Sequence, residues 1–85
     1  MKVVLKLYAS LTDYLPQKGR DQRHDVDVEV EPGATVGDVI ERFHLPRRSV
    51  HLVLVNGLYV EPKQRSTRAL AEGDHLAIWP PVAGG

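Results

Sequence analysis

The sequence has no cysteine, and it has only one tryptophan and one phenylalanine among its 85 residues. Without cysteine, the chain has no disulfide, no thiolate metal ligand and no cysteine nucleophile. It also cannot carry sulfur as a protein persulfide. The four histidines fall in different expected elements without metal-like spacing, so we expect no metal site.

Charge of one sign is not in excess either, because eleven Lys and Arg residues balance eleven Asp and Glu residues. The overall balance therefore does not attract the chain to nucleic acid or to an anionic membrane. We interpret the loop cations as solvated, with a basic docking rim for an acidic partner as the alternative. They are Lys18, Arg20, Arg23, Arg47, Arg48, Lys63, Arg65 and Arg68.

Long hydrophobic runs are missing as well. No apolar stretch approaches the roughly 18 residues of a membrane helix, and residues 1–4 begin a strand pattern, not a signal peptide. We therefore expect a cytoplasmic protein that binds no membrane. A chain of 85 residues forms one domain and has little room for a deep enclosed active site, so we expect a protein that is not an enzyme.

Hydrophobic patterns are present, and they predict strands and turns. Alternation of apolar and polar residues indicates half-buried strands, whereas the nearly continuous apolar run at 50–55 favours a central strand covered on both faces. Asn56-Gly57 predicts a type I′ hairpin, because that turn needs positive φ at both positions. Pro80 and Pro81 end the last strand. The predicted strands are residues 3–8, 26–30, 50–55, 58–60 and 75–79.

The clearest helix is predicted at residues 36–43. Val36, Val39, Ile40 and Phe43 form one apolar stripe at helical spacing. Thr35 precedes them as a candidate N-cap. A short helical turn at 11–15 and an exposed loop at 18–24 complete the prediction.

The order of these elements indicates an α+β fold, in which a mixed sheet of about four or five strands is covered on one face by the helix. We expect residues 1–81 to form the domain and residues 82–85 to be a flexible tail. The predicted core comprises Val3, Leu5, Leu7, Val28, Val39, Ile40, Phe43, Val53, Val55, Leu70, Leu76 and Ile78.

The sequence ends in Pro-Pro-Val-Ala-Gly-Gly at residues 80–85. Paired prolines stiffen the exit from the last strand, and the small residues that follow can pass through a narrow channel into another protein. The Gly85 carboxylate is unobstructed, because glycine has no Cβ. We predict Gly85 as the reacting residue. The predicted tail that enters the partner's active site consists of Pro81, Val82, Ala83 and Gly84.

Trp79 is a candidate partner-binding residue next to this tail. If Leu76 and Ile78 face the core, Trp79 faces the opposite side of the strand. Tryptophan is enriched among interface hot spots, which favours a partner-facing anchor. The alternative is a tryptophan that folds back over the edge of the core.

Four segments resemble the MoaD and ThiS family of β-grasp sulfur carriers, which are ubiquitin-like proteins. They are Gly-Ala-Thr-Val-Gly-Asp-Val-Ile (33–40), Val-Asn-Gly (55–57), Glu-Gly-Asp (72–74) and Trp-Pro-Pro-Val-Ala-Gly-Gly (79–85). The ending is most like the small subunit of molybdopterin synthase. Two other segments, residues 8–16 and 45–57, look more like the ubiquitin-like domain found joined to Mut7-C.

The resemblance implies a chemistry for Gly85. An E1-like adenylating enzyme would use ATP to form an acyl adenylate there, and a sulfur donor would displace AMP to leave a thiocarboxylate. An acceptor synthase, similar to the large subunit of molybdopterin synthase, would take the sulfur. The carrier itself would bind no cofactor and would be a monomer when free.

The resemblance leaves several functions open. Sulfur donation in molybdopterin or tungstopterin assembly comes first, followed by sulfur donation to another product such as thiamine. A ubiquitin-like modifier would instead form an isopeptide bond through Gly85. A non-catalytic β-grasp interaction module would use neither reaction.

Overall fold

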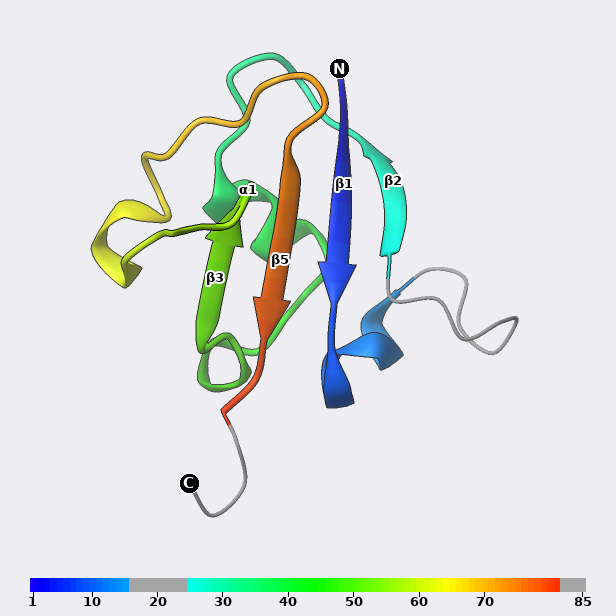
Figure 1. Ribbon diagram of the computed structural model, residues 1–85, viewed down its shortest axis with the longest axis vertical. Helices are drawn as coiled ribbons and strands as arrows, with labels where there is room; N and C mark the ends of the chain where they lie inside the picture. Colours follow the sequence, from blue (N-terminus) through cyan, green and yellow to red (C-terminus); the bar gives the residue numbers. More distant parts are fainter. Residues whose placement is uncertain (16–24, 82–85) are drawn as a thin grey trace.

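A computed structural model gives the structure of the protein and describes residues 1–15 and 25–81. Within these residues, strands alternate with one α-helix and three short 3-10 helices, labelled η (Figure 1). The predicted loop at 18–24 lies outside the described residues. The elements are β1 (Lys2–Leu7), η1 (Ala9–Tyr14), β2 (Asp25–Glu29), α1 (Val36–Arg42), η2 (Arg47–Ser49), β3 (Leu52–Val55), β4 (Leu58–Tyr59), η3 (Pro62–Gln64) and β5 (His75–Trp79).

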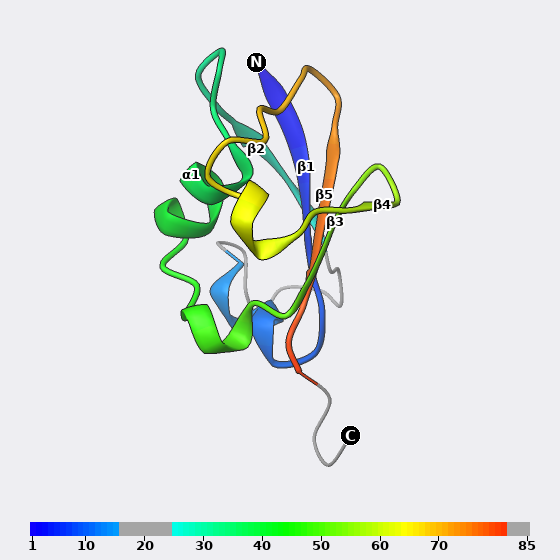
Figure 2. The same cartoon turned by 90° about the vertical axis from the view of Figure 1, so that its left-hand side faces the viewer.

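The strands form one mixed five-stranded sheet in the order β2-β1-β5-β3-β4. The central pair, β1 and β5, is parallel, and the other neighbours are antiparallel. Figure 2 shows α1 on one side of this sheet. We call the side that faces α1 the core face and the other side the open face. The predicted α+β, β-grasp architecture is confirmed.

A capping box fixes the start of α1. The Thr35 side chain accepts a hydrogen bond from the Asp38 backbone N–H at 3.1 Å, and the Asp38 carboxylate accepts one from the Thr35 N–H at 3.0 Å. These bonds satisfy two N–H groups that a helix terminus otherwise leaves unpaired. The helix ends at Arg42, with Phe43 as its C-cap, so the predicted helix is one residue too long.

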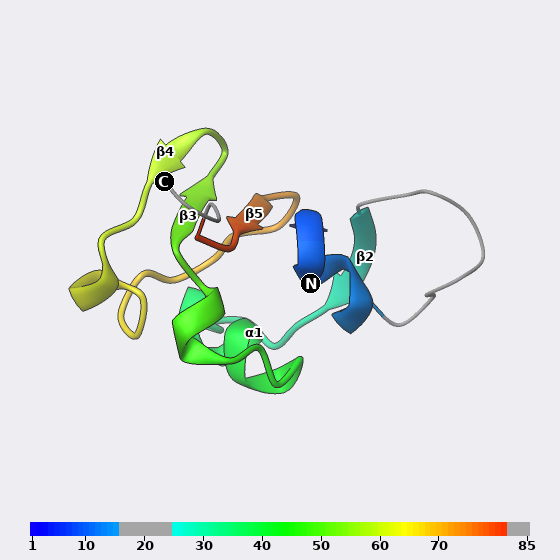
Figure 3. The ribbon, with the colours of Figure 1, turned by 90° about the horizontal axis from the view of Figure 1, so that it is seen from below.

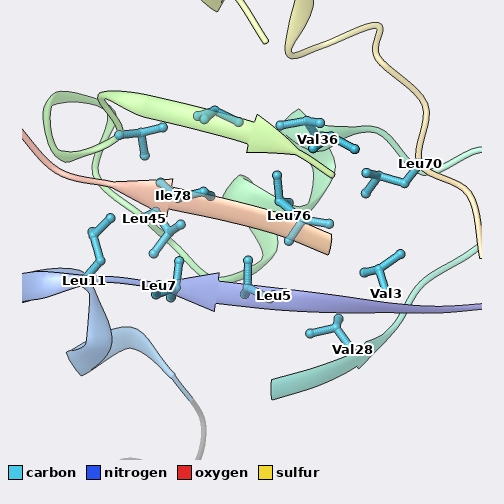
Figure 4. Packing of buried hydrophobic residues seen from close by; sticks show 14 of the residues in the cluster. Val3, Leu5, Leu7, Leu11, Val28, Val36, Leu45, Leu70, Leu76 and Ile78 are labelled. Carbon is cyan, nitrogen blue, oxygen red and sulfur yellow. The ribbon is translucent and has the colours of Figure 1, made fainter. Parts of the chain in front are cut away.

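The core lies between the sheet and α1, where side chains from several elements converge (Figure 4). Ten of the predicted core residues are buried, whereas Ile40 and Phe43 are only partly buried and pack against the cluster. Both lie toward the end of a short helix, where the stripe turns away from the sheet. Six further buried residues complete the cluster: Leu11, Leu15, Val36, Leu45, Val50 and Val60.

β3 differs from its prediction, which was a strand over 50–55 covered on both faces. The strand begins at Leu52, after the 3-10 helix η2. Val53 and Val55 are fully buried, but Leu52 is 36% exposed. The reason is that α1 covers only the core face, so an apolar run on this strand has one open side.

The hairpin between β3 and β4 is confirmed, since φ is 51° at Asn56 and 84° at Gly57. Side chains tie this hairpin to the start of β5. Asp74, which is 9% exposed, accepts hydrogen bonds from the Asn56 amide at 2.9 Å and from the Ala71 backbone N–H at 2.8 Å. The side-chain oxygen of Asn56, Oδ1, in turn accepts a hydrogen bond from the His75 backbone N–H. The hairpin and β5 are therefore held in a fixed register.

Among the described residues, no helix is both long enough and apolar enough to cross a membrane.

Candidate functional site

The candidate tail leaves the body at the end of β5. Trp79 is the last residue of that strand, Pro80 is half-buried and Pro81 is exposed. Figure 1 places η1 at this same end of the molecule, which we call the exit end. The remaining predicted tail residues lie outside the described part of the chain: Val82, Ala83, Gly84 and Gly85.

Trp79 packs against an aromatic partner that sequence analysis did not single out. Its ring stacks on that of Tyr8, with centroids 4.2 Å apart and planes 3° apart. The Tyr8 backbone N–H also donates to the carbonyl of Ile78, at 3.2 Å. Because Ile78 is fully buried in the core, its neighbour Trp79 faces the open side. Trp79 is half-buried, so the stack orients the indole and leaves part of it accessible.

The stack belongs to a larger apolar surface on the open face. Strand register places Leu52 beside Trp79, and Leu54 between Ala77 and Tyr59. Leu52 is 36% and Tyr59 is 55% exposed. Clustered exposed apolar side chains of this kind mark interaction sites more often than isolated ones do. We call this surface the open-face patch and define it as Tyr8, Leu52, Leu54, Tyr59, Ala77 and Trp79.

The signals for this patch were present in the sequence but ambiguous. Tyr8 continues the alternation of β1 onto the open face, since Leu7 before it is fully buried. Leu52 and Leu54 lie in the apolar run that predicted a strand buried on both sides. A run of that kind does not reveal which of its faces lacks a cover.

The patch presents apolar side chains, and no metal-binding group lies beside it within the part of the chain that the structure describes. Over residues 1–15 and 25–81, no group of three or more His, Cys, Asp or Glu side chains is placed to hold a metal ion. His44, His51 and His75 are each exposed. His44 follows α1, His51 precedes β3 and His75 begins β5, and His24 lies outside the described residues. The exposed apolar side chains of the patch are suited to contact with another apolar surface.

Comparison with known families identifies the chain. The Mut7-C ubiquitin family model matches residues 1–84. The chain belongs to the Mut7-C ubiquitin family. This match confirms the likeness of residues 8–16 and 45–57 to the ubiquitin-like domain that accompanies Mut7-C. No curated protein sequence gives a significant match.

Solved structures agree with this assignment along the length of the chain. SAMP1 from Haloferax volcanii is 28% identical, with a TM-score of 0.70, and the comparison covers 100% of both chains. A putative molybdopterin converting factor, subunit 1, from Pyrococcus furiosus is 25% identical, with a TM-score of 0.68 over 96% of this chain and 99% of that one. The predicted resemblance to ubiquitin-like sulfur carriers of the β-grasp fold is thereby confirmed.

A more distant likeness shows the fold alone. It is to a complex of subunits 1 and 2 of the molybdopterin-converting factor from Helicobacter pylori 26695. The identity is 16% and the TM-score is 0.60, with 100% of both chains covered.

Proposed function

We propose that this member of the Mut7-C ubiquitin family is a sulfur carrier whose Gly85 is adenylated and converted to a thiocarboxylate. Its sulfur goes to molybdopterin or tungstopterin assembly. The observation that carries the proposal is the likeness, over 96% of the chain, to a putative molybdopterin converting factor subunit 1. The Ala-Gly-Gly sequence at 83–85 supplies a residue suited to the reaction.

The chemistry requires little of the carrier beyond its carboxylate. A carboxylate oxygen of Gly85 attacks the α-phosphorus of ATP, and pyrophosphate leaves. The terminal sulfur of a donor persulfide then attacks the carbonyl carbon, and AMP leaves. A thiol next attacks the donor's sulfur in the acyl disulfide, so that the donor leaves as a disulfide and the thiocarboxylate is released. The resulting thiocarboxylate sulfur is a nucleophile for the acceptor. In this proposal the chain is a substrate and carrier, and an E1-like enzyme supplies catalysis and ATP.

The open-face patch supports the proposal because it includes Trp79, which lies close to the tail in the sequence. Trp79 is separated from residues 82–85 only by Pro80 and Pro81. A partner that covers the patch therefore holds the start of the tail at its own surface. Positioning of this kind is demanding, since about 1 Å of misplacement can reduce a rate on the order of 100-fold. We assign the patch to the E1-like enzyme and, after sulfur loading, to a synthase large subunit.

Deletion of Gly85 tests the proposal, with ATP–pyrophosphate exchange by the E1-like enzyme of the source organism as the measurement. We expect exchange with the full chain and none with the deletion, while circular dichroism shows both to be folded. Gly84→Val is the matched variant: it keeps the carboxylate, and its side chain obstructs a narrow channel. Equal exchange by the Gly85 deletion would refute the carrier function and favour a non-catalytic interaction module.

Intact mass of the protein purified from its native cells tests for the thiocarboxylate, and transfer of its sulfur to a precursor distinguishes the acceptor classes. We expect a species in which one oxygen is replaced by sulfur, and we expect its sulfur to pass to a pterin precursor. Passage to a thiazole precursor of thiamine would instead assign the carrier to that pathway.

A second function has one specific observation in its favour. A further structural neighbour, 28% identical over 95% of this chain, is the H. volcanii small archaeal modifier protein 1. A modifier would use the same adenylate but would transfer Gly85 to the amine of a target lysine. Recovery of target lysines linked to the C-terminal peptide of this chain, without any thiocarboxylate, would establish the modifier function in place of the carrier.

A further inference from the structure

A segment with basic but no acidic residues runs from the end of α1 to the end of β4. Residues 42–60 contain three arginines and no Asp or Glu, although the whole chain has equal numbers of both signs. Two of these arginines, Arg47 and Arg48, lie on η2, and both are exposed. We call Arg47 and Arg48 the basic rim.

The rim lies at the exit end, beside the start of the tail. The backbone N–H of His51 donates to the carbonyl of Trp79 at 3.0 Å, and Leu52 pairs with Trp79 in the sheet. Figure 3, seen from below, shows the segment before β3 beside the end of β5. The rim is therefore continuous, through His51 and Leu52, with the open-face patch.

The backbone that presents the rim is held in place. The Val50 N–H donates to the Arg47 carbonyl at 3.1 Å, and the Val50 side chain is buried. Arg65 follows η3, and its guanidinium donates hydrogen bonds to the backbone carbonyls of Val50 and His51 at 3.4 and 3.1 Å. The Arg65 guanidinium is thus engaged in hydrogen bonds to backbone carbonyls. Within the described residues, Arg47 and Arg48 form no ion pair.

The acids of β2 lie away from the rim. Asp25, Asp27 and Glu29 are on β2, at the other edge of the sheet from β4. Three strand spacings separate β2 from β3, which amounts to about 14 Å. That exceeds the screening length of about 8 Å at physiological ionic strength. The β2 acids therefore do not neutralise the two exposed cations of the rim, although the chain as a whole has no net charge.

We propose that the basic rim binds acidic side chains around the mouth of the channel that receives the tail in the E1-like enzyme. The inference rests on the proposed function, and it adds that the partner's surface around the channel is acidic. Opposite charges at a rim steer the encounter and fix its orientation more than they add affinity. Here they direct the tail toward the channel as the open-face patch makes contact.

Charge reversal tests this directly in ATP–pyrophosphate exchange, with the concentration of carrier varied. We expect Arg47→Glu with Arg48→Glu to raise the KM for the carrier about tenfold at low ionic strength, because steering of this kind changes association rates by about tenfold or more. The kcat should be unchanged, since the carboxylate and channel are untouched. The difference should shrink as salt is added.

Two matched variants separate charge from other effects. Lys63→Glu reverses one exposed charge on η3, which Figure 1 shows in yellow, away from the end of β5, and we expect it to leave KM within about twofold. Arg47→Lys with Arg48→Lys keeps the charges and should retain most of the wild-type KM. If the reversals match Lys63→Glu, or if their effect is independent of salt, the inference is overturned.

The outcome is separable from that of the proposed function. Exchange by the wild-type chain is measured first, and its absence would remove both proposals. Wild-type exchange with an unchanged KM in the reversals would remove only the rim. A labelled single-stranded RNA is assayed in parallel by fluorescence anisotropy. If RNA binding is lost in the reversals while KM is unchanged, the rim is a nucleic-acid site and the inference is wrong.

Discussion

The two faces of the sheet are built from the same strands, and on β3 and β5 both faces carry apolar side chains, yet the faces differ in what covers them. On β5, Leu76 and Ile78 point to the core face and are fully buried, whereas Trp79 on the open face is half-buried. On β3, Val53 is fully buried and its neighbour Leu52 is 36% exposed. The comparison teaches that apolar side chains of one strand can serve stability on one face and recognition on the other. The position of α1 determines which face is buried.

Truncation on the core face should give the largest effect. Leu76 lies between Leu5 and Val55 in the sheet and is fully buried. Replacement by alanine should lower the free energy of unfolding by about 2–5 kcal/mol, because the cavity adds to the lost burial. Leu52→Ala is the matched control on the open face of β3, and it should cost less than about 1 kcal/mol. Urea denaturation measures both, and equal losses would contradict the distinction between the faces.

Truncation on the open face should reverse this pattern. Trp79→Ala should weaken binding to the E1-like enzyme by about 2 kcal/mol, the scale of a hot spot. The free energy of unfolding should fall by only about 1 kcal/mol, because the Tyr8 stack is lost. Titration calorimetry measures the first quantity and urea denaturation the second.

Tyr8→Phe is the matched control for Trp79→Ala, because it keeps an aromatic ring against the indole and so should preserve binding. The open-face patch would be wrong as a docking site if Trp79→Ala bound with wild-type affinity while remaining folded.

The sequence predicted the fold wherever a periodic signal and its physical cause coincided. Asn56-Gly57 suits the positive φ that a type I′ turn needs. The alternation around Val28 and Ile78 determines which side chains of a half-buried strand face the core. The core residues that escaped prediction, such as Leu11, Leu45 and Val60, lie in or beside irregular segments. There, burial depends on how distant elements meet, which no local pattern records.

The candidate site was predictable only in its chain positions. Trp79 was identified from alternation on β5, and the structure places it on the open face, beside the exit. Tyr8 and Leu52 were missed as its neighbours, because they come from strands far away in the sequence. Their proximity follows from the parallel pairing of β1 with β5 and the antiparallel pairing of β3 with β5. Pairing of that kind is a tertiary property.

The smallest expected effect concerns the element that separates the two faces. Thr35→Ala removes the side-chain acceptor for the Asp38 N–H at the start of α1, and loss of such a cap costs about 1 kcal/mol. The loss should appear in urea denaturation, while affinity for the E1-like enzyme should be unchanged, because α1 lies across the core from the open-face patch. Thr35→Ser keeps the hydroxyl and is the matched control, with stability expected within about 0.5 kcal/mol of wild type. A drop in affinity for folded Thr35→Ala, with Thr35→Ser normal, would show that the partner contacts the start of α1. The assignment of stability to one face and recognition to the other would then fail.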